Sequence, residues 1–260
     1  MKIATFNING IKARAGALTD WLDDARPDVA LLQEIKSTDD AFPRALIEDR
    51  GYNLATHGQK GFNGVAILSK YPLEDVQHGL PGDDADTQAR WIEATVTGDT
   101  HPVRLCGLYL PNGNPAPGPK YDYKLAWMAR LHAHAKTLLA TEMPVVLAGD
   151  YNIIPHDEDA ARPEAWTGDA LARPDSRKAF RRLLSLGLTE AIRTRNRAPG
   201  LYSFWDYQAG AWDRNDGIRI DHHLLSPEAA DLLRDAWIEK DMRGREKPSD
   251  HVPVWIDLAA

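Results

Sequence analysis

Polar residues recur along this chain at the points where apolar, strand-like runs end. Such runs cover residues 2–6, 29–33, 145–148 and 218–220, and one more, residues 252–258, leads away from such a point. Polar groups at strand ends converge on one rim of a sheet, which is where α/β proteins build active sites. One rim is therefore expected to gather the side chains of Asn7, Glu34, Asp150, Asn152, Asp221, Asp250 and His251.

The order of elements predicts an α/β protein. Four strand-like runs, residues 53–56, 65–69, 91–97 and 103–110, follow one another with Gly and Pro between them. Helical patterns cover residues 17–25, 39–50, 120–139, 176–185 and 227–234, and another strand is expected at 219–225. The two halves share this order loosely, which predicts two packed sheets with helices outside. No linker is visible, and the Pro-rich segment 111–119 is typical of a functional loop, so residues 1–260 are expected to form one domain.

The apolar stretches and the cysteine content indicate the cellular compartment. No apolar stretch approaches the roughly 20 residues needed to span a bilayer. Strand-like sequence begins at residue 2, with no apolar export signal before it. The single cysteine, Cys106, lies in an apolar run and is interpreted as a small buried hydrophobe. We therefore expect a reducing cytoplasm and no membrane contact. A monomer is expected as well, although the sequence carries no pattern that fixes the oligomeric state.

The charge balance constrains any nucleic-acid partner. The chain has 38 acidic and 31 basic residues, for a net charge of −7. Because DNA binding depends on Lys and Arg that neutralise phosphates, positive charge would have to gather on one face. The candidate clusters are Lys12 with Arg14, Lys120 with Lys124, Arg193 with Arg195 and Arg197, Arg214 with Arg219, and Arg243 with Arg245 and Lys247.

A series of short motifs spans nearly the whole chain. In order, they are Phe-Asn-Ile-Asn-Gly from Phe6, Leu-Gln-Glu-Ile-Lys from Leu32, Gly-Val-Ala-Ile-Leu-Ser from Gly64, Tyr-Leu-Pro-Asn-Gly from Tyr109, Gly-Asp-Tyr-Asn from Gly149, Arg-Ile-Asp-His from Arg219 and Glu-Lys-Pro-Ser-Asp-His from Glu246. The series resembles the exonuclease III family of DNA repair nucleases and AP endonucleases, within a larger endonuclease, exonuclease and phosphatase superfamily. Each motif alone is weak, and their order carries the resemblance.

The resemblance implies a fold and an activity. The implied fold is a four-layered α/β sandwich of two packed mixed sheets flanked by helices. The implied activity is magnesium-dependent cleavage of double-stranded DNA at abasic sites or from 3′ ends. Abasic endonuclease, 3′ to 5′ exonuclease, 3′ phosphatase and ribonuclease H activities all remain open.

A metal site is expected around Glu34. Mg²⁺ prefers oxygen ligands and is usually held by one or two carboxylates together with a substrate phosphate. Glu34 is the main candidate ligand, with Asn7 and Asp250 beside it, and Mn²⁺ is a possible substitute for Mg²⁺. The resemblance places a glutamate ligand at this position as well.

The catalytic step is expected to use Asp150 and Asn152. Alternate residues of an extended segment share one side, so this pair can hold one water. Asp150 would accept the proton of the water as general base, while Asn152 donates a hydrogen bond to the water or the phosphate. The alternative is an Asx turn at a strand end, where Asp and Asn are common anyway.

Four further residues are expected to contact the phosphate or to orient a residue that does. Asp221 would fix the tautomer of His251 and favour its charged form, which leaves the other ring nitrogen for a phosphate oxygen. Tyr109, at a strand end, would add a hydrogen bond, and Asn112 another from the loop beyond. The resemblance further implies that Phe204, Ile218 and Ile220 line a small apolar pocket for a flipped baseless sugar.

The sequence also departs from the family. Ile35, Tyr151 and His156 stand where Thr, an apolar residue and a small hydroxyl residue are more usual, and His156 could narrow the entrance to the site. Two other functions remain open. One is a related phosphodiesterase or phosphatase acting on a small phosphoester or a lipid headgroup, because fold alone does not fix the substrate. The other is a catalytically silent DNA-binding module.

Overall fold

The computed structural model describes residues 1–260 and contains twelve strands. They are β1 (Lys2–Asn7), β2 (Val29–Gln33), β3 (Asn53–His57), β4 (Val65–Ser69), β5 (Glu74–His78), β6 (Trp91–Thr97), β7 (Pro102–Tyr109), β8 (Val145–Asp150), β9 (Thr189–Glu190), β10 (Asp221–Leu225), β11 (Leu233–Ile238) and β12 (Val254–Leu258). One six-stranded sheet has the order β11-β12-β1-β2-β4-β3 and the other the order β5-β6-β7-β8-β10-β9. The pairs β1–β2 and β7–β8 are parallel and the others antiparallel, so both sheets are mixed.

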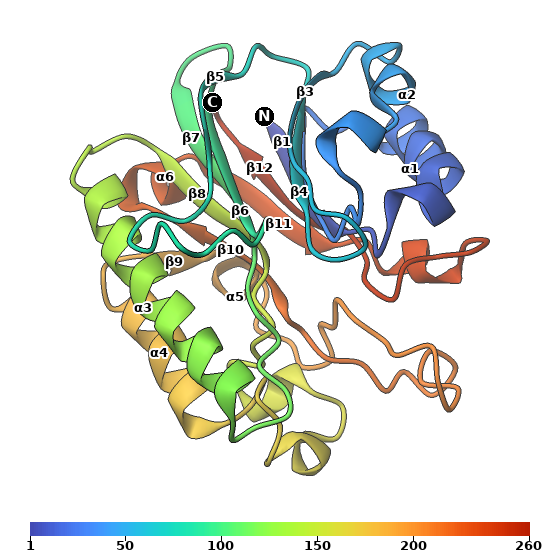
Figure 1. Cartoon of the computed structure of the whole chain (residues 1–260), viewed down its shortest axis with the longest axis vertical. Coiled ribbons are helices and arrows are strands. Elements are labelled where there is room, and N and C mark those ends of the chain that lie inside the picture. Colours follow the sequence, from blue (N-terminus) through green and yellow to red (C-terminus); the bar gives the residue numbers. More distant parts are fainter.

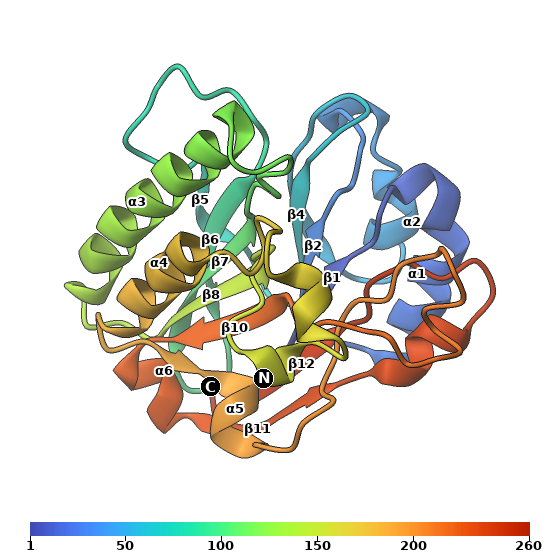
Figure 2. The same cartoon turned by 90° about the horizontal axis from the view of Figure 1, so that it is seen from below.

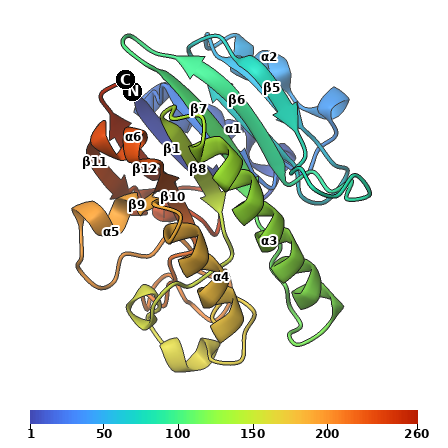
Figure 3. The ribbon, with the colours of Figure 1, turned by 90° about the vertical axis from the view of Figure 1, so that its left-hand side faces the viewer.

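Helices cover the outer faces of the two sheets. The α-helices are α1 (Ile11–Ala25), α2 (Arg44–Glu48), α3 (Pro119–Leu139), α4 (Pro174–Leu184), α5 (Ala191–Arg195) and α6 (Pro227–Asp231), and the 3₁₀ turns are η1 (Asp39–Ala41), η2 (Asp157–Asp159), η3 (Pro163–Trp166) and η4 (Lys240–Gly244). The helices α1 and α2 lie on one side of the paired sheets and α3 and α4 on the other (Figure 2). The last two run next to each other (Figure 3). None of the helices combines the length and the apolar character needed to cross a membrane.

Alternating side chains of the strands build three cores. In β1, Ile3 belongs to a core between the two sheets, whereas its neighbour Ala4 faces the outer core under α1 and α2. The third core joins the second sheet to α3 and α4, and Cys106 is fully buried in it, as expected. The layers are therefore helix, sheet, sheet and helix, which confirms the four-layered sandwich.

The two sheets do not correspond to the two halves of the sequence. The C-terminal strands β11 and β12 join the first sheet, where β12 pairs antiparallel with β1. The strands β5 to β7, from the first half, build the second sheet instead. This exchange places both chain ends at one end of the molecule (Figure 1). Asn7, at the far end of β1, lies at the opposite end of the first sheet.

Several expected elements were wrong in extent. The helix expected at 39–50 is broken into η1 and α2, because Pro43 forces the preceding Phe42 into an extended conformation. The helix expected at 227–234 ends at Asp231, and β11 begins two residues later. The strand expected at 218–220 is only a set of isolated bridges at Ile218, and β10 begins at Asp221. The strands β5, β9 and β11 and the helix α5 were not expected.

Candidate active site

Strand register brings three of the expected catalytic residues side by side. Tyr109 ends β7 and lies opposite Asp150, which ends the parallel strand β8. Asp150 in turn lies opposite Asp221, the first residue of the antiparallel strand β10. The rim of the second sheet therefore presents a tyrosine and two carboxylates in one row.

Asn7 connects this row to the first sheet. It ends β1, and Glu34 follows directly after the neighbouring parallel strand β2. The side-chain Nδ2 of Asn7 donates to Glu34 Oε1 at 2.9 Å and to Asp150 Oδ2 at 3.0 Å. One buried amide thus holds together carboxylates from the two sheets.

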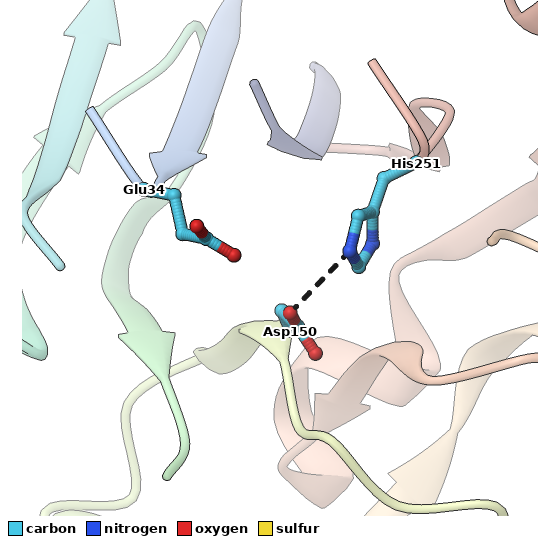
Figure 4. A group of neighbouring side chains, drawn as sticks. All are labelled: Glu34, Asp150 and His251. Atoms are coloured by element: carbon cyan, nitrogen blue, oxygen red, sulfur yellow. Dashed lines mark ion pairs between the residues drawn. The ribbon is translucent and has the colours of Figure 1, made fainter. Parts of the chain in front are cut away.

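His251 lies between two carboxylates, just before β12. Its Nδ1 is 2.9 Å from Asp221 Oδ2, and its Nε2 is 3.6 Å from Asp150 Oδ2. The imidazole points toward Asp150, with Glu34 across from it (Figure 4). Ser203 Oγ donates to Asp221 Oδ2 at 2.6 Å and fixes that carboxylate. The structure thus shows the expected contact between Asp221 and His251.

The electrostatics of the site favour a cationic imidazole. Burial lowers the pKa of His251, but the carboxylates of Asp221 and Asp150 outweigh burial and raise it to about 10. Burial raises the pKa of Asp150, and although His251 opposes this effect, the carboxylates of Asp221 and Glu34 add to it. A carboxylate with a raised pKa is suited to accept a proton near neutral pH.

Glu34 and Tyr109 differ in charge. Burial raises the pKa of Glu34, but the hydrogen bond from Asn7 and a 2.9 Å ion pair with Lys36 outweigh burial and lower it overall. Burial raises the pKa of Tyr109 well above its ordinary value, and the carboxylates of Glu34 and Asp150 add to this. Glu34 is therefore an anion at neutral pH, while Tyr109 keeps a hydroxyl proton that it can donate.

A metal ion has suitable ligands here. Glu34, Asp150 and His251 each offer a ligand atom, and these atoms lie within 4.8 Å of one another. A protonated imidazole cannot bind a cation, so the two carboxylates are the fitting ligands, and their oxygens suit a hard divalent ion. Asp250 is not part of this compact group, and its Oδ1 accepts a hydrogen bond from Asn9 Nδ2 at 3.1 Å.

The extended geometry expected for Asp150 and Asn152 was wrong. Asn152 has a positive φ of 48°, and its backbone N–H donates to Asp150 Oδ1 at 2.9 Å, which is an Asx turn. The side-chain Nδ2 of Asn152 donates to Leu110 O, and its Oδ1 accepts a hydrogen bond from Asn112 Nδ2 at 3.1 Å. The turn, rather than strand alternation, sets the direction of Asn152.

An open hollow of about 170 Å³ lies beside these groups. Ten of the twelve expected site residues line it, namely Glu34, Tyr109, Asn112, Asp150, Asn152, Phe204, Ile218, Ile220, Asp250 and His251. Asn7 and Asp221 are fully buried behind it. The ring of Phe204 meets that of His251 edge-on, with 5.0 Å between centroids. The hollow therefore has a charged wall and an apolar wall.

Comparison with known proteins identifies the family. The model of the Endonuclease/Exonuclease/phosphatase family matches residues 4–251. Exodeoxyribonuclease III of Haemophilus influenzae is 36% identical over 99% of this chain and 100% of its own length. The chain belongs to the Endonuclease/Exonuclease/phosphatase family. It is accordingly a hydrolase that acts on phosphoester bonds.

Solved structures of this family match the whole fold. A 3′-5′ exonuclease from Neisseria meningitidis has a TM-score of 0.95, with 38% identity and 99% of each chain covered. An AP endonuclease from Archaeoglobus fulgidus has a TM-score of 0.94, with 33% identity and full coverage of both chains. A further match at a TM-score of 0.95 and 38% identity is a Neisseria 3′ phosphatase bound to a product DNA hairpin.

Sequence reasoning missed several residues of the site. Trp166, Asn114 and Leu171 also line the hollow. The last turn of η3 places Trp166 there, and η3 follows Pro163 without any periodic pattern. Ser203 stands inside a segment rich in aromatic residues, which is typical of core packing, so nothing in the local sequence indicated its contact with Asp221. Lys124 lies beneath the site, on the same face of α3 as Tyr121, Met128 and Leu131, so the helical spacing of these apolar residues was the signal for its burial.

Three residues of the candidate basic clusters are buried and cannot reach a phosphate. Lys124 and Arg219 are buried, with 0% and 1% of their surface exposed, and Arg243 is 7% exposed. Arg219 instead donates to Asp159 and Glu190 inside the protein. The expected effect of His156 on the entrance was also wrong, because this residue is exposed and lines a separate hollow around Arg193. Lys124, Arg219 and Arg243 therefore donate hydrogen bonds to groups inside the protein.

Proposed function

We propose that this chain is a DNA repair nuclease that hydrolyses phosphodiesters at abasic sites and at the 3′ ends of double-stranded DNA. One observation carries the proposal: Asp150 lies between His251 and Glu34 at the wall of an open hollow. The names of the relatives support a DNA substrate, since they include exodeoxyribonucleases and a 3′ phosphatase bound to DNA. We further propose that residues 1–260 act as one catalytic domain and as a monomer in the cytoplasm.

The residues of the site divide the reaction among them. Asp150 takes a proton from the attacking water, and the turn at Asn152 orients that water. The imidazolium of His251, held by Asp221, stabilises negative charge on a phosphate oxygen. Tyr109 and Asn112 donate further hydrogen bonds to the phosphate. Phe204, Ile218 and Ile220 form the apolar wall against which a baseless sugar lies.

Glu34 is proposed as the main ligand of Mg²⁺, with Asn7 and Asp250 beside it and Mn²⁺ as a substitute. A bound divalent cation would stabilise the charge of the phosphate as a Lewis acid. Glu34 fits this role because its carboxylate is an anion and has an oxygen within 4.8 Å of one of Asp150. Removal of the metal by a chelator should abolish turnover, and added Mg²⁺ or Mn²⁺ should restore it.

The test is a time course on one labelled duplex that carries an abasic analogue, a recessed 3′ end or a 3′ phosphate. We expect magnesium-dependent cleavage of at least one of them. Inertness toward all three, with turnover of a phosphoinositide or another small phosphoester, would instead support the related phosphoesterase function. Absence of any turnover in a folded protein that binds duplex DNA would support the silent binding module.

A further inference from the structure

The hollow at the active site adjoins a second, larger hollow. The larger one has a volume of about 330 Å³, against about 170 Å³ for the first. Trp166, Phe204 and Ile218 line both, so these three side chains form the boundary between them. The segment that carries Trp166, in yellow, and the loop at 206–217, in orange, both extend from the same end of the sheets (Figure 1). The two hollows therefore share a wall made of these three side chains.

The larger hollow has an aromatic wall and a polar rim. Trp166 and Phe204 are half-buried, and Ile218 and three alanines, Ala211 among them, add to the apolar surface. At the rim, Arg162 Nε donates to Asp216 Oδ2 at 2.9 Å, and Arg214 lies 3.7 Å from the same carboxylate. The two arginine side chains are more than half exposed. Asp169 and Asp206 line the same hollow, so its carboxylates outnumber its arginines and its charge does not select a phosphate. The flat ring of Trp166 is suited to stacking by a planar aromatic ligand.

The two hollows together offer space for two parts of a nucleotide. Ligand pockets usually measure about 300 to 1,000 Å³, and the larger hollow of about 330 Å³ alone reaches that range. A sugar held against Phe204 in the smaller hollow would direct its base across the shared boundary. The base would then face Trp166. Bases stack on aromatic side chains with little dependence on sequence, because every base has a flat face.

We propose that the larger hollow is a nucleobase subsite, in which Trp166 stacks on the base of an unpaired 3′-terminal nucleotide. The proposal rests on the DNA nuclease function proposed above and extends it to the choice of substrate. A baseless sugar would use only the smaller hollow, whereas an intact terminal nucleotide would use both. The subsite would thus support removal of intact 3′ nucleotides, and fraying of the end lowers the cost of placing the base there.

The experiment compares two duplexes, one with an internal abasic analogue and one with a mismatched 3′-terminal nucleotide. Two variants perturb the subsite. Trp166→Ala removes the stacking surface, but Trp166 lines both hollows. Ala211→Leu fills the larger hollow, and Ala211 does not line the smaller one. Each should lower kcat/KM for the terminal nucleotide by about tenfold, given the usual strength of stacking. Incision at the abasic analogue should change by much less, and Trp166→Phe should retain most of the activity on both duplexes.

A binding measurement separates stacking from folding. In an Asp150→Asn background, a fluorescent 2-aminopurine at the 3′ terminus should be quenched on binding, and Trp166→Ala should abolish this quenching. Leu46→Ala, an exposed apolar truncation on α2 outside both hollows, serves as the matched control. Equal losses on both duplexes, no loss on either, or unchanged quenching in Trp166→Ala would each overturn the subsite. Failure of the wild-type protein to cleave either duplex would overturn the proposed nuclease function itself.

Discussion

Replacement of Lys124 by Met should separate the stability of this protein from its activity. Lys124 is fully buried on α3 and forms no ion pair. Its Nζ donates to the backbone carbonyl of Asn112 at 3.0 Å and to that of Asn152 at 2.6 Å. Methionine keeps a similar length but donates no hydrogen bond. The substitution therefore releases two segments that carry expected site residues.

Two opposing terms set the change in stability. Each carbonyl left without a donor costs about 1 to 3 kcal/mol. Burial, however, lowers the pKa of Lys124 from 10.5 to about 7, which costs the native state about 4 to 5 kcal/mol below pH 7. The variant avoids that cost. Its free energy of unfolding near pH 7.5 should therefore lie within about 2 kcal/mol of the wild-type value.

The pH dependence gives the sharper test. Between pH 7 and 10.5 the unfolded chain holds more protons at Lys124 than the native state, so this group makes stability rise with pH. From pH 7.5 to pH 9.5 the wild-type protein should gain about 2.5 kcal/mol relative to Lys124→Met. Urea unfolding at both pH values measures this difference, with Lys120→Met, an exposed lysine on the same helix, as control. A difference that is the same at both pH values would refute the buried-lysine argument.

The activity of the same variant should fall although it remains folded. Loosened segments at Asn112 and Asn152 misplace groups that orient the water and the phosphate, and small misplacements cost about ten- to a hundredfold in rate. We expect the loss in kcat, with KM for the duplex nearly unchanged. Lys124→Arg should recover part of it, because arginine still donates to carbonyls. A full kcat in Lys124→Met would remove this lysine from any positioning role.

Four other changes test the site and its surroundings. Glu34→Gln should lower magnesium affinity and turnover without unfolding the protein, and near-normal turnover at limiting Mg²⁺ would exclude Glu34 as a ligand. Asp150→Asn should reduce cleavage by several orders of magnitude and leave duplex binding intact, since a general base acts on the water; parallel loss of binding in a filter assay would contradict this. Phe204→Ala should merge the two hollows and weaken the preference for an abasic site over an intact nucleotide, as measured by competition between the two duplexes. His223 is buried with neither ring nitrogen hydrogen-bonded, and burial, aided by His222 and opposed by Glu190, lowers its pKa to about 3. The unfolded chain therefore binds the additional proton below pH 6.5, and wild-type stability should drop by about 2 kcal/mol from pH 7.5 to pH 5 through this group, a drop that His223→Leu should lack in urea unfolding.

The parts of the fold that follow from local pattern could be predicted from the sequence. The strands β2, β4 and β6 were expected with the bounds that the structure shows, because apolar runs bounded by turn residues specify buried strands. The strand β5 was not predicted because all five of its residues are exposed, so it has no apolar run. The strand β11 was not predicted because it follows α6 after a single residue, and the helix expected at 227–234 extends over its first two residues. Edge strands with little burial leave little signal in sequence.

The gathering of site residues was predictable, but their geometry was not. Strand ends meet at a rim whatever the register, so Asp150 and Asp221 could be grouped in advance. The exact opposition of these two residues depends on the pairing of β8 with β10, which is a long-range contact. The Asx turn at Asn152 and the carbonyl partners of Lys124 likewise depend on backbone groups that meet only in the folded chain. Local pattern carries no information about such contacts.

The charge of the site explains how an acidic chain can act on DNA. Around the hollow, the carboxyl groups of Glu34, Asp150, Asp221 and Asp250 outnumber the cationic side chains of Lys36 and His251. Such a rim would repel a phosphate, and a divalent cation among the carboxylates reverses that local field. The neighbouring hollow does not supply this positive charge, because Arg162 and Arg214 pair with Asp216 and further carboxylates line it. We therefore expect metal removal to weaken DNA binding as well as turnover, whereas a purely catalytic metal would leave binding unchanged.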